Sequence, residues 1–312
     1  MQEQNILIIK LGALGDVILR TGTVMSIHER FPNAKITVMT TKPFVSLFKS
    51  MSCVSDVIVD TKPRYNLLEW FKTCKINIAD KKWDYIFDLQ VSKRTRNRYF
   101  NLVRFFSPFP VNWGCYRKKG FSFRFVEKNK RFSLGKITTS EMDFDFLPVD
   151  LSFLKGEGKN FNLLPDKPFM LVIPGCSASH PYKRWPAEKY LELVLSAEKK
   201  GIPTVVLGTN AESAEIEQIC KNSKAISFQN KASLFDIPEL AKRACAVVGN
   251  DTGPVHMSCY SKTPVLVLFC QKTASSANEL PNVLNLISED ISDILVNDVW
   301  TAVQERMKVA EK

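Results

Sequence analysis

The stretch "GNDTGPVH", residues 249–256, places an acid, a hydroxyl, a glycine, a proline and a histidine directly after an apolar run. Pro254 suits the first turn of a helix, where no backbone N–H is lost, and Gly253 lets the backbone approach a ligand closely. Free N–H groups at a helix start attract anions. A helix capped by Asp251 or Thr252, with no ligand, would carry the same residues. The predicted ligand contacts are Asn250, Asp251, Thr252, Gly253, Pro254 and His256.

A second stretch, "PGCSASHPYKRWP" at 174–186, follows the apolar run "FMLVI". Gly175 opens the turn, and Lys183 and Arg184 lie just before a helix expected to start at Pro186. A lysine in such a turn neutralises a phosphate as a point charge. The alternative interpretation is a solvated basic turn. Two phosphate-suited loops in one half of the chain favour nucleotide binding.

The third stretch is "KLGALGDVIL", residues 10–19, where Gly12 and Gly15 flank a tight turn. Asp16 lies near the expected start of a helix, so it is either a helix cap or a general base, and the residues alone leave both readings open. The complete G-x-G-x-x-G pattern of dinucleotide-binding folds is absent, which makes this a weak signal by itself.

The elements that hold these stretches alternate as strand and helix, which predicts an α/β fold with parallel sheets. In the first half we expect strands at 5–10, 34–40, 54–60 and 83–89, with a helix over 16–30. In the second half we expect strands at 169–175, 203–208, 246–250 and 264–269, and helices at 186–200, 211–221 and 234–244.

The predicted domains are residues 1–155 and 166–290, followed by a C-terminal helix over 291–312. The linker falls within 148–168, which contains three prolines in "PVDLSFLKGEGKNFNLLPDKP". All three candidate stretches follow strands. They therefore lie at the carboxyl edges of the sheets, where open α/β folds bind ligands.

The net charge of +11 belongs to the first half of the chain. Residues 1–150 hold 25 Lys and Arg against 14 Asp and Glu, whereas residues 151–312 hold 18 of each. Within 93–136, a segment also rich in aromatic residues, 13 basic residues face one acid, Glu127. Such asymmetry indicates an acidic partner: a nucleic acid, a phospholipid surface or a phosphorylated substrate.

Other classes of protein are disfavoured by the composition. The N-terminus "MQEQNILIIKLG" does not read as a signal peptide, and no apolar run is long enough to span a membrane. Eight cysteines without a Cys-x-x-Cys pair, together with three histidines, argue against a zinc site or a disulfide framework. We expect a cytoplasmic protein.

Taken together, "LGALGDVI", "PGCSASHPYKRWP" and "GNDTGPVH" resemble glycosyltransferase family 9, the bacterial lipopolysaccharide heptosyltransferases. The resemblance covers about residues 5 to 273 and includes "GTNAESAEIEQI". It implies a GT-B fold, with two Rossmann-like domains facing across a cleft. It also implies an inverting, metal-independent transfer from ADP-heptose to a phosphorylated lipid A core acceptor at the inner membrane surface, without a cofactor.

The resemblance also implies roles for individual residues. Asp16 matches the general base, and Lys183 the lysine that holds the donor diphosphate. Gly175, Arg184 and the 250–256 stretch fall on the donor side. The basic segment falls on the acceptor side, where the candidate contacts are Gly12, Gly15, Lys93, Arg94, Arg96, Arg98, Arg117, Lys118 and Lys119. We interpret "DFD" at 143–145 as a coincidence within a helical pattern, not as a metal-binding Asp-x-Asp.

Two alternatives follow from the remaining sequence. The family usually has "LFGPT" after its last strand, whereas this chain has "LFCQKT", with Cys270 and Gln271 in place of glycine and proline. A related transferase using another nucleotide sugar or glycan acceptor is therefore an alternative. A nucleic-acid-binding protein that uses residues 93–136 is a more remote one, because it leaves the neutral second half unexplained. We expect no nucleic-acid partner.

Overall fold

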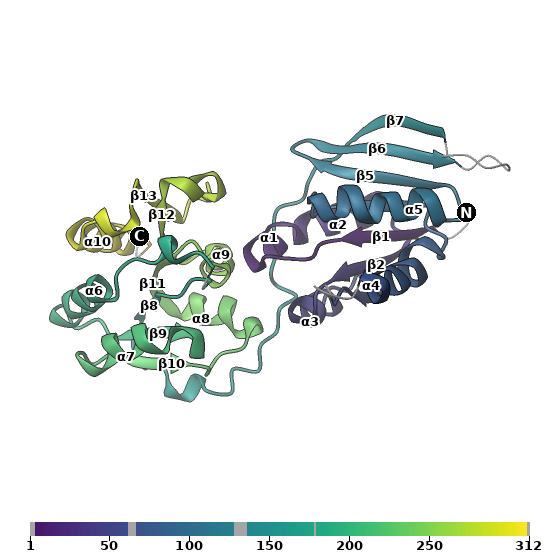
Figure 1. Ribbon diagram of the computed structural model, residues 1–312. Helices are drawn as coiled ribbons and strands as arrows, with labels where there is room; N and C mark the ends of the chain where they lie inside the picture. The colour runs from purple at the N-terminus through teal and green to yellow at the C-terminus, as the bar shows by residue number, and fades with distance from the viewer. Residues whose placement is uncertain (1–3, 62–66, 128–135, 178, 311–312) are drawn as a thin grey trace. The chain divides into compact units, whose positions relative to one another are not determined.

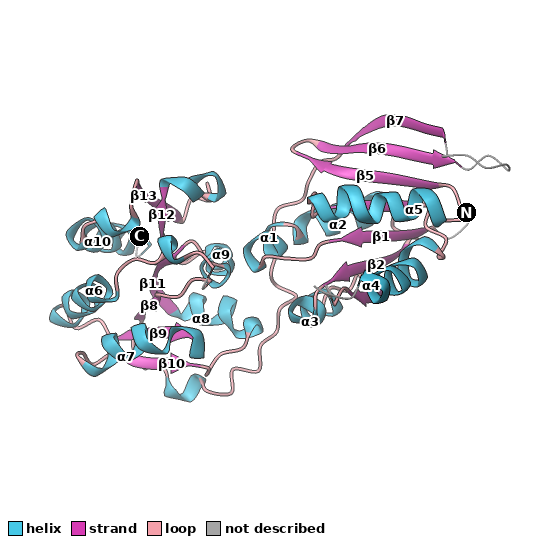
Figure 2. Cartoon of the chain, in the orientation of Figure 1, coloured by secondary structure: helices cyan, strands magenta, loops and turns pink. Residues whose placement is uncertain are grey.

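The computed structural model describes residues 4–61, 67–127, 136–177 and 179–310 (Figure 1). The chain divides into two compact units, Met1–Phe153 and Leu154–Lys312. Each unit is built around its own sheet, coloured magenta in Figure 2.

The described part of unit 1 contains a seven-stranded sheet with the order β3-β2-β1-β4-β5-β6-β7. The first five strands of this order are parallel, and β5, β6 and β7 form an antiparallel meander. The apolar "NILII" run makes β1 the centre of the parallel part, buried on both faces. The strands are β1 (Asn5–Ile9), β2 (Lys35–Thr40), β3 (Asp56–Val59), β4 (Tyr85–Asp88), β5 (Val111–Arg117), β6 (Gly120–Glu127) and β7 (Lys136–Asp143).

Helices cover this sheet and bury a core against it. One core cluster joins Leu7 and Ile86 of the sheet to Ile78 and Leu102 of the covering segments, with Trp113 of β5 fully buried among them. The helical segments are α1 (Leu14–Leu19), α2 (Thr21–Arg30), η1 (Lys42–Phe44), α3 (Val45–Lys49), α4 (Leu67–Cys74), η2 (Lys75–Ala79), η3 (Arg94–Tyr99) and α5 (Phe100–Phe106).

Unit 2 contains a six-stranded sheet among its described residues, with the order β10-β9-β8-β11-β12-β13 and every pair parallel. The strand order reverses between β8 and β11, which makes the carboxyl ends of these strands the expected ligand edge. The strands are β8 (Phe169–Ile173), β9 (Thr204–Gly208), β10 (Ile226–Gln229), β11 (Ala244–Asn250), β12 (Val265–Cys270) and β13 (Val283–Ser288).

In unit 2, α6, α7 and α10 lie on one side of the sheet, and α8 and α9 on the other (Figure 1). Tyr190 of α6, Ile216 of α7 and Val299 of α10 join the same core cluster. The helical segments are η4 (Phe161–Leu163), η5 (Pro181–Lys183), α6 (Ala187–Lys199), η6 (Asn210–Glu212), α7 (Ser213–Lys221), η7 (Leu234–Asp236), α8 (Ile237–Arg243), α9 (Gly253–Ser258), η8 (Cys259–Ser261), η9 (Gln271–Ser276), η10 (Ile291–Asp293) and α10 (Val296–Ala310).

Three expectations about elements are corrected. The helix expected over 16–30 is two helices, interrupted at Arg20, whose φ of −97° and ψ of −3° end α1. The helical pattern assigned to "TTSEMDFDF" is wrong, because residues 136–143 form β7 and pair with β6 over their whole length. Strands β10 and β13 were not expected from the sequence. Residues 128–135 of the basic segment lie outside the described residues.

Candidate functional site

The loops after β8, β11 and β12 meet at the carboxyl edge of the unit 2 sheet. Asp251 is the centre of this edge: its Oδ2 lies 2.5 Å from Lys183 Nζ, and its Oδ1 lies 2.8 Å from His256 Nε2. Ser276 of η9 lies near the same carboxylate, at 3.4 Å from Oδ2. The structure therefore joins three separate stretches of sequence at one buried acid.

The ionisation of Asp251 follows from these contacts. Burial raises the pKa of this carboxyl, but hydrogen bonds and charge from His256 and Lys183 outweigh burial and lower the pKa to about 2. Asp251 is thus a carboxylate at neutral pH, with Lys183 as its paired cation. Lys183 remains partly exposed, with 19% of its side chain accessible, and an ammonium has three donors. Its other N–H groups remain available to an anion from solution.

The helix that follows Asp251 differs from the expectation of side-chain capping. The N-cap of α9 is Thr252, whose side chain makes no capping hydrogen bond, and Asp251 bonds to Lys183 and His256 instead of the helix. Pro254 does occupy the first turn, as expected. Thr252, Gly253 and Pro254 are half-buried. They can contact a ligand through their backbone, whereas His256 is buried behind them.

Asn250 was expected to bind the donor, and the structure gives it a different role. The residue is fully buried, and its Oδ1 accepts hydrogen bonds from Trp185 N at 3.1 Å and Tyr190 Oη at 2.9 Å. Its Nδ2 donates to Pro174 O at 2.6 Å. With both amide atoms occupied, Asn250 holds the loop after β8 against the end of β11. It is a positioning residue, not a ligand contact.

Arg184 is similarly committed to the protein. Its guanidinium pairs with Glu215 Oε1 at 2.6 Å and donates to Cys176 O at 2.9 Å. Trp185 anchors the same loop in the core, where its Nε1 donates to Ile294 O. Gly175 has no room for a side chain, since an added Cβ would lie 2.7 Å from Glu212 Cγ. These residues fix the loop that presents Lys183.

Sequence reasoning missed two residues at this edge. Lys272 of η9 is exposed, and its Nζ lies 5.6 Å from the ring of Tyr182, an exposed residue of η5. Only the position of "QKT" directly after a buried strand pointed to Lys272. Cys270, one of the two departures from the family pattern, is buried in the core, while Gln271 is exposed at the loop.

At the carboxyl edge of unit 1, Asp16 lies in the first turn of α1 and is exposed. The N-cap of α1 is Ala13, so the reading of Asp16 as a helix cap is wrong. Gly12 and Gly15 are half-buried in the same turn. The position leaves the carboxylate accessible to a substrate.

The predicted acceptor cations follow strands that end at this same edge. η3 comes shortly after β4, and the turn with Lys118 and Lys119 comes after β5, which is parallel to β4. Lys93, Arg96, Arg98, Lys118 and Lys119 are exposed. Arg117 is exposed too, but it pairs with Glu141.

Arg94 is not a free cation. Its Nη2 lies 2.8 Å from Oδ1 of the buried Asp60, and its Nε donates to Tyr99 Oη, which itself donates to Asp60 Oδ2 at 2.6 Å. This network ties η3 to the end of β3. The charge of Arg94 is already matched within the protein, which argues against its role as an acceptor contact.

Two buried charged groups at this edge were also missed. Lys10 directly follows β1 and is 4% exposed, and Asp88, the last residue of β4, is fully buried. Burial lowers the pKa of Lys10 to about 8, although Asp16 and Asp88 raise it. Burial raises the pKa of Asp88. Lys10 stands at the start of the glycine turn, which was the available signal.

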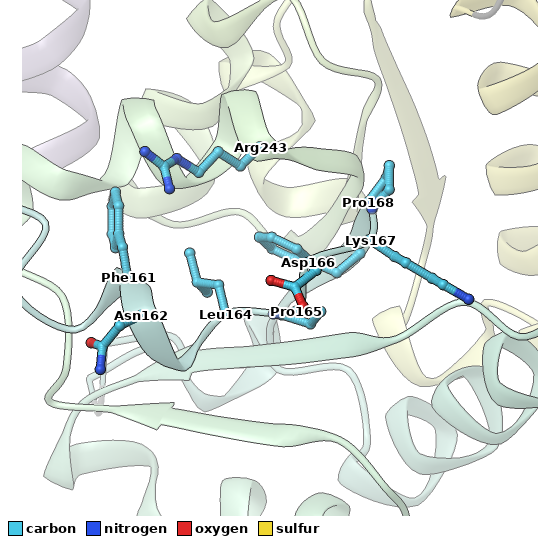
Figure 3. A pocket seen from close by; sticks show the side chains of 9 residues that line it. Phe161, Asn162, Leu164, Pro165, Asp166, Lys167, Pro168 and Arg243 are labelled. Carbon is cyan, nitrogen blue, oxygen red and sulfur yellow. The ribbon is translucent and has the colours of Figure 1, made fainter.

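A pocket of about 450 Å³ lies at the amino end of β8, away from the carboxyl edge of the sheet (Figure 3). Phe161, Leu164 and Arg243 line it, with Arg243 stacked 4.7 Å from the Phe161 ring. None of the predicted site residues belongs to it. No cluster of three or more potential metal ligands occurs within the described residues.

Comparison with known proteins identifies relatives of the whole fold. The family model of glycosyltransferase family 9 (heptosyltransferase) matches residues 139–292. The lipopolysaccharide core heptosyltransferase OpsX of Haemophilus influenzae is 23% identical over 319 residues, covering 92% of this chain and 86% of that protein.

Solved structures agree with this relationship. A glycosyl transferase family 9 protein from Veillonella parvula superposes with a TM-score of 0.71 at 17% identity, covering 98% of this chain and 97% of the other. The ADP-heptose LPS heptosyltransferase II of E. coli gives a TM-score of 0.70 at 17% identity, covering 99% and 100%. The GT-B fold class expected from the sequence is confirmed.

Proposed function

We propose that this chain, which belongs to glycosyltransferase family 9, transfers heptose from ADP-heptose to a phosphorylated lipid A core acceptor with inversion. The observation that carries the proposal is the Lys183–Asp251–His256 cluster at the strand-order reversal of unit 2. Heptosyltransferase OpsX and the E. coli enzyme named for ADP-heptose support the donor and the glycan class.

The chemistry is a single displacement. The acceptor hydroxyl gives its proton to the Asp16 carboxylate while its oxygen bonds to the anomeric carbon of the donor. The bond from that carbon to the diphosphate oxygen breaks, and its electron pair leaves with ADP. Lys183 stabilises the negative charge that develops on the diphosphate, so these residues need no metal ion for this purpose.

Asp251 prepares Lys183 for this role. As a buried carboxylate it fixes the ammonium in the loop, and His256 and Ser276 hold the carboxylate in turn. Preorganised charge of this kind requires no rearrangement during the reaction. Thr252 and Gly253 directly follow β11 at the same edge and are half-buried, so their backbone N–H groups are the proposed contacts to the remaining phosphate oxygens.

The test is release of ADP from ADP-heptose with Kdo-lipid A as acceptor. Asp16→Asn should lower kcat by at least about 100-fold while ADP still binds. Asp56→Asn, an exposed acid at the other end of the parallel strands, is the matched control and should behave as wild type. Near-wild-type turnover by Asp16→Asn would remove the general base from the proposal.

The donor side has its own variant. Lys183→Ala should weaken ADP binding by about tenfold to a hundredfold, because a charge-assisted contact to the diphosphate is lost. Lys221→Ala, which removes an exposed lysine paired with Glu217, is the control. Equal ADP affinity of wild type and Lys183→Ala, measured by calorimetry, would refute the role. Transfer that persists in excess chelator supports metal independence, and loss of transfer would contradict it.

A second candidate function is transfer of a different sugar. Gln271 is exposed at the ligand edge where the family usually has proline, and this position favours a change in the nucleotide or sugar. A panel of ADP-, GDP- and UDP-sugars compared at equal concentration decides between the two. ADP-heptose should give the highest kcat/KM if the first proposal holds.

The acceptor implies work at the cytoplasmic face of the inner membrane. No helix among the described residues is long and apolar enough to cross a bilayer. Four apolar side chains of α4, η2 and α5 are nevertheless 45–66% exposed: Leu68, Ile76, Phe105 and Phe106. Exposed cations lie on the same segments or nearby in the chain, for example Lys72 and Arg98. Apolar anchors with basic neighbours suit an anionic lipid surface.

Sedimentation with vesicles tests this association. Wild type should bind vesicles containing anionic lipid and release at high salt. The double variant Phe105→Ser, Phe106→Ser should bind several-fold more weakly, and Leu163→Ser, an equally exposed apolar residue of unit 2, should not. Identical binding of all three proteins would exclude Phe105 and Phe106 as membrane contacts.

A further inference from the structure

The carboxyl edge of the unit 1 sheet contains a cation that its own structure leaves unmatched. Lys10 is 4% exposed, yet its ammonium makes no hydrogen bond or ion pair with any part of the chain that the structure describes. Only its backbone N–H is bonded, to Met39 O at 3.0 Å. The side chain is buried along most of its length, but Nζ is not one of the fully buried unpaired atoms, so the charged end still meets solvent. An ammonium held in this way adds no internal ion pair to folding stability and is open to an anion.

Lys10 lies at the strand-order reversal of its sheet. The order β3-β2-β1-β4-β5 turns back between β1 and β4, and Lys10 follows the end of β1 directly. In open α/β sheets, ligands bind outside the carboxyl ends of the strands at such a point. Asp16 lies six residues later in the chain, at the same edge of the sheet. The unmatched ammonium is therefore in the region where a substrate of unit 1 would bind.

Asp88 supports this cation from inside the protein. It is paired in register with Ile9, the residue before Lys10, and is fully buried. Its Oδ1 accepts hydrogen bonds from the backbone N–H groups of Gln90 and Val91 at 3.1 and 2.8 Å. Its Oδ2 has no well-formed hydrogen bond to the described residues, although the Thr95 hydroxyl is close enough to lower the pKa.

The charges around Lys10 come from several elements. Asp16 of α1 and Asp88 of β4 raise its pKa, and Arg20, between α1 and α2, lowers it. Burial has the largest effect. Within the described ranges, no acid forms an ion pair with Lys10, so the position can accept one further negative group.

We propose that Lys10 is an acceptor-binding residue whose ammonium contacts an anionic oxygen of the acceptor next to the hydroxyl that Asp16 deprotonates. Asp88 is a positioning residue that keeps the ammonium charged. The ligand class is an oxyanion, either a sugar-acid carboxylate or a phosphate. The inference rests on the proposed function, because it assumes that unit 1 binds the acceptor of that reaction.

Kinetics and stability together test the role. Lys10→Met should raise the acceptor KM by about tenfold to a hundredfold, because a charge-assisted hydrogen bond is lost. The KM for ADP-heptose should not change. The melting temperature should stay the same or rise, since the ammonium contributes no internal pair. Lys35→Met, an exposed lysine at the start of β2, is the control.

The pH profile separates binding from a structural role. A lysine with a pKa of about 8 loses its charge above that pH, so wild-type acceptor affinity should fall through this range. Asp88→Asn removes a charge that raises this pKa, and the fall should move to lower pH. Lys10→Arg stays protonated, and the fall should disappear. An unchanged profile in both variants would overturn the assignment.

A binding readout keeps this inference separate from the proposed function. Lysines of the full chain are labelled biosynthetically with ¹³C, and the Lys10 resonance, assigned with Lys10→Arg, is followed by NMR. Free Kdo or inorganic phosphate should shift it, which also identifies the anion, whereas sodium chloride at equal ionic strength should not. Wild type without transferase activity would refute the proposed function. No shift, together with wild-type acceptor KM in Lys10→Met, would refute the role of Lys10.

Discussion

Asp251→Asn tests whether the buried carboxylate is as strongly held as its contacts indicate. The substitution keeps the size of the side chain but removes the charge between Lys183 and His256. The pKa of Asp251 is lowered from 3.8 to about 2, which corresponds to about 2 kcal/mol of folding free energy at neutral pH. For a unit of this size, that is a fall in melting temperature of about 4–8 °C.

The sign of the pH dependence follows from the direction of the pKa shift. A carboxyl whose pKa is lower in the folded state stabilises the protein above its unfolded value of 3.8, and the contribution is lost as pH falls through about 2. The difference in unfolding free energy between wild type and Asp251→Asn should therefore have its full value at pH 7. It should shrink as the pH approaches 2.

Scanning calorimetry of the full chain at several pH values is the measurement. Asp293→Asn, an exposed acid of the same unit, is the control and should change stability by less than about 0.5 kcal/mol. The reasoning fails if Asp251→Asn melts within 1 °C of wild type at pH 7 (roughly the precision needed to resolve the effect). It also fails if the difference stays constant down to acidic pH.

Three further substitutions probe contacts that the structure assigns to folding, with urea unfolding as the common assay. Asn250→Ala leaves the partners of the buried amide unsatisfied and should cost about 3 kcal/mol; a cost below 1 kcal/mol would argue against the positioning role. Arg94→Gln removes the cation of a buried pair and should cost about 3 kcal/mol, whereas Arg98→Gln, exposed on the same segment, should cost almost nothing, and equal effects would contradict the Asp60 network. Gly22→Ala places a Cβ 2.3 Å from Leu147 O, so the backbone must move at a cost of about 1–3 kcal/mol, and a stable variant would disprove that close approach.

The position of the three motifs follows from the rule that ligands bind at strand ends. Parallel strands such as β1, β8 and β12 could be predicted because each is a short, continuous apolar run. The edge strands β10 and β13 could not be predicted, because polar residues interrupt their sequences, ISFQ and VLNLIS. β7 could not, since Thr138, Thr139, Ser140 and Glu141 lie exposed on an edge strand and have no apolar alternation to mark it. Its strand conformation depends on pairing with β6, which is a tertiary interaction.

The individual roles of polar site residues were harder to predict than their location. Arg94 and Asn250 both belong to stretches chosen for their chemistry, yet each is satisfied by partners 34 to 76 residues away in the chain. The local sequence around Arg94 and Asn250 does not predict such distant partners. Lys10 could not be singled out either, because only the structure shows that its ammonium has no partner among the described residues.

β7 leaves one consequence for the behaviour of the protein in solution. As the last strand of its sheet it offers a row of backbone N–H and C=O groups to any passing chain, the geometry from which intermolecular sheets grow. The hydroxyl and carboxylate side chains along β7 keep this edge hydrated and disfavour pairing with an apolar strand of another molecule. A variant with valine or isoleucine at Thr138 and Ser140 would expose an apolar edge strand. It should aggregate in a concentration-dependent manner, while the loops at the ligand edge of unit 2 remain intact.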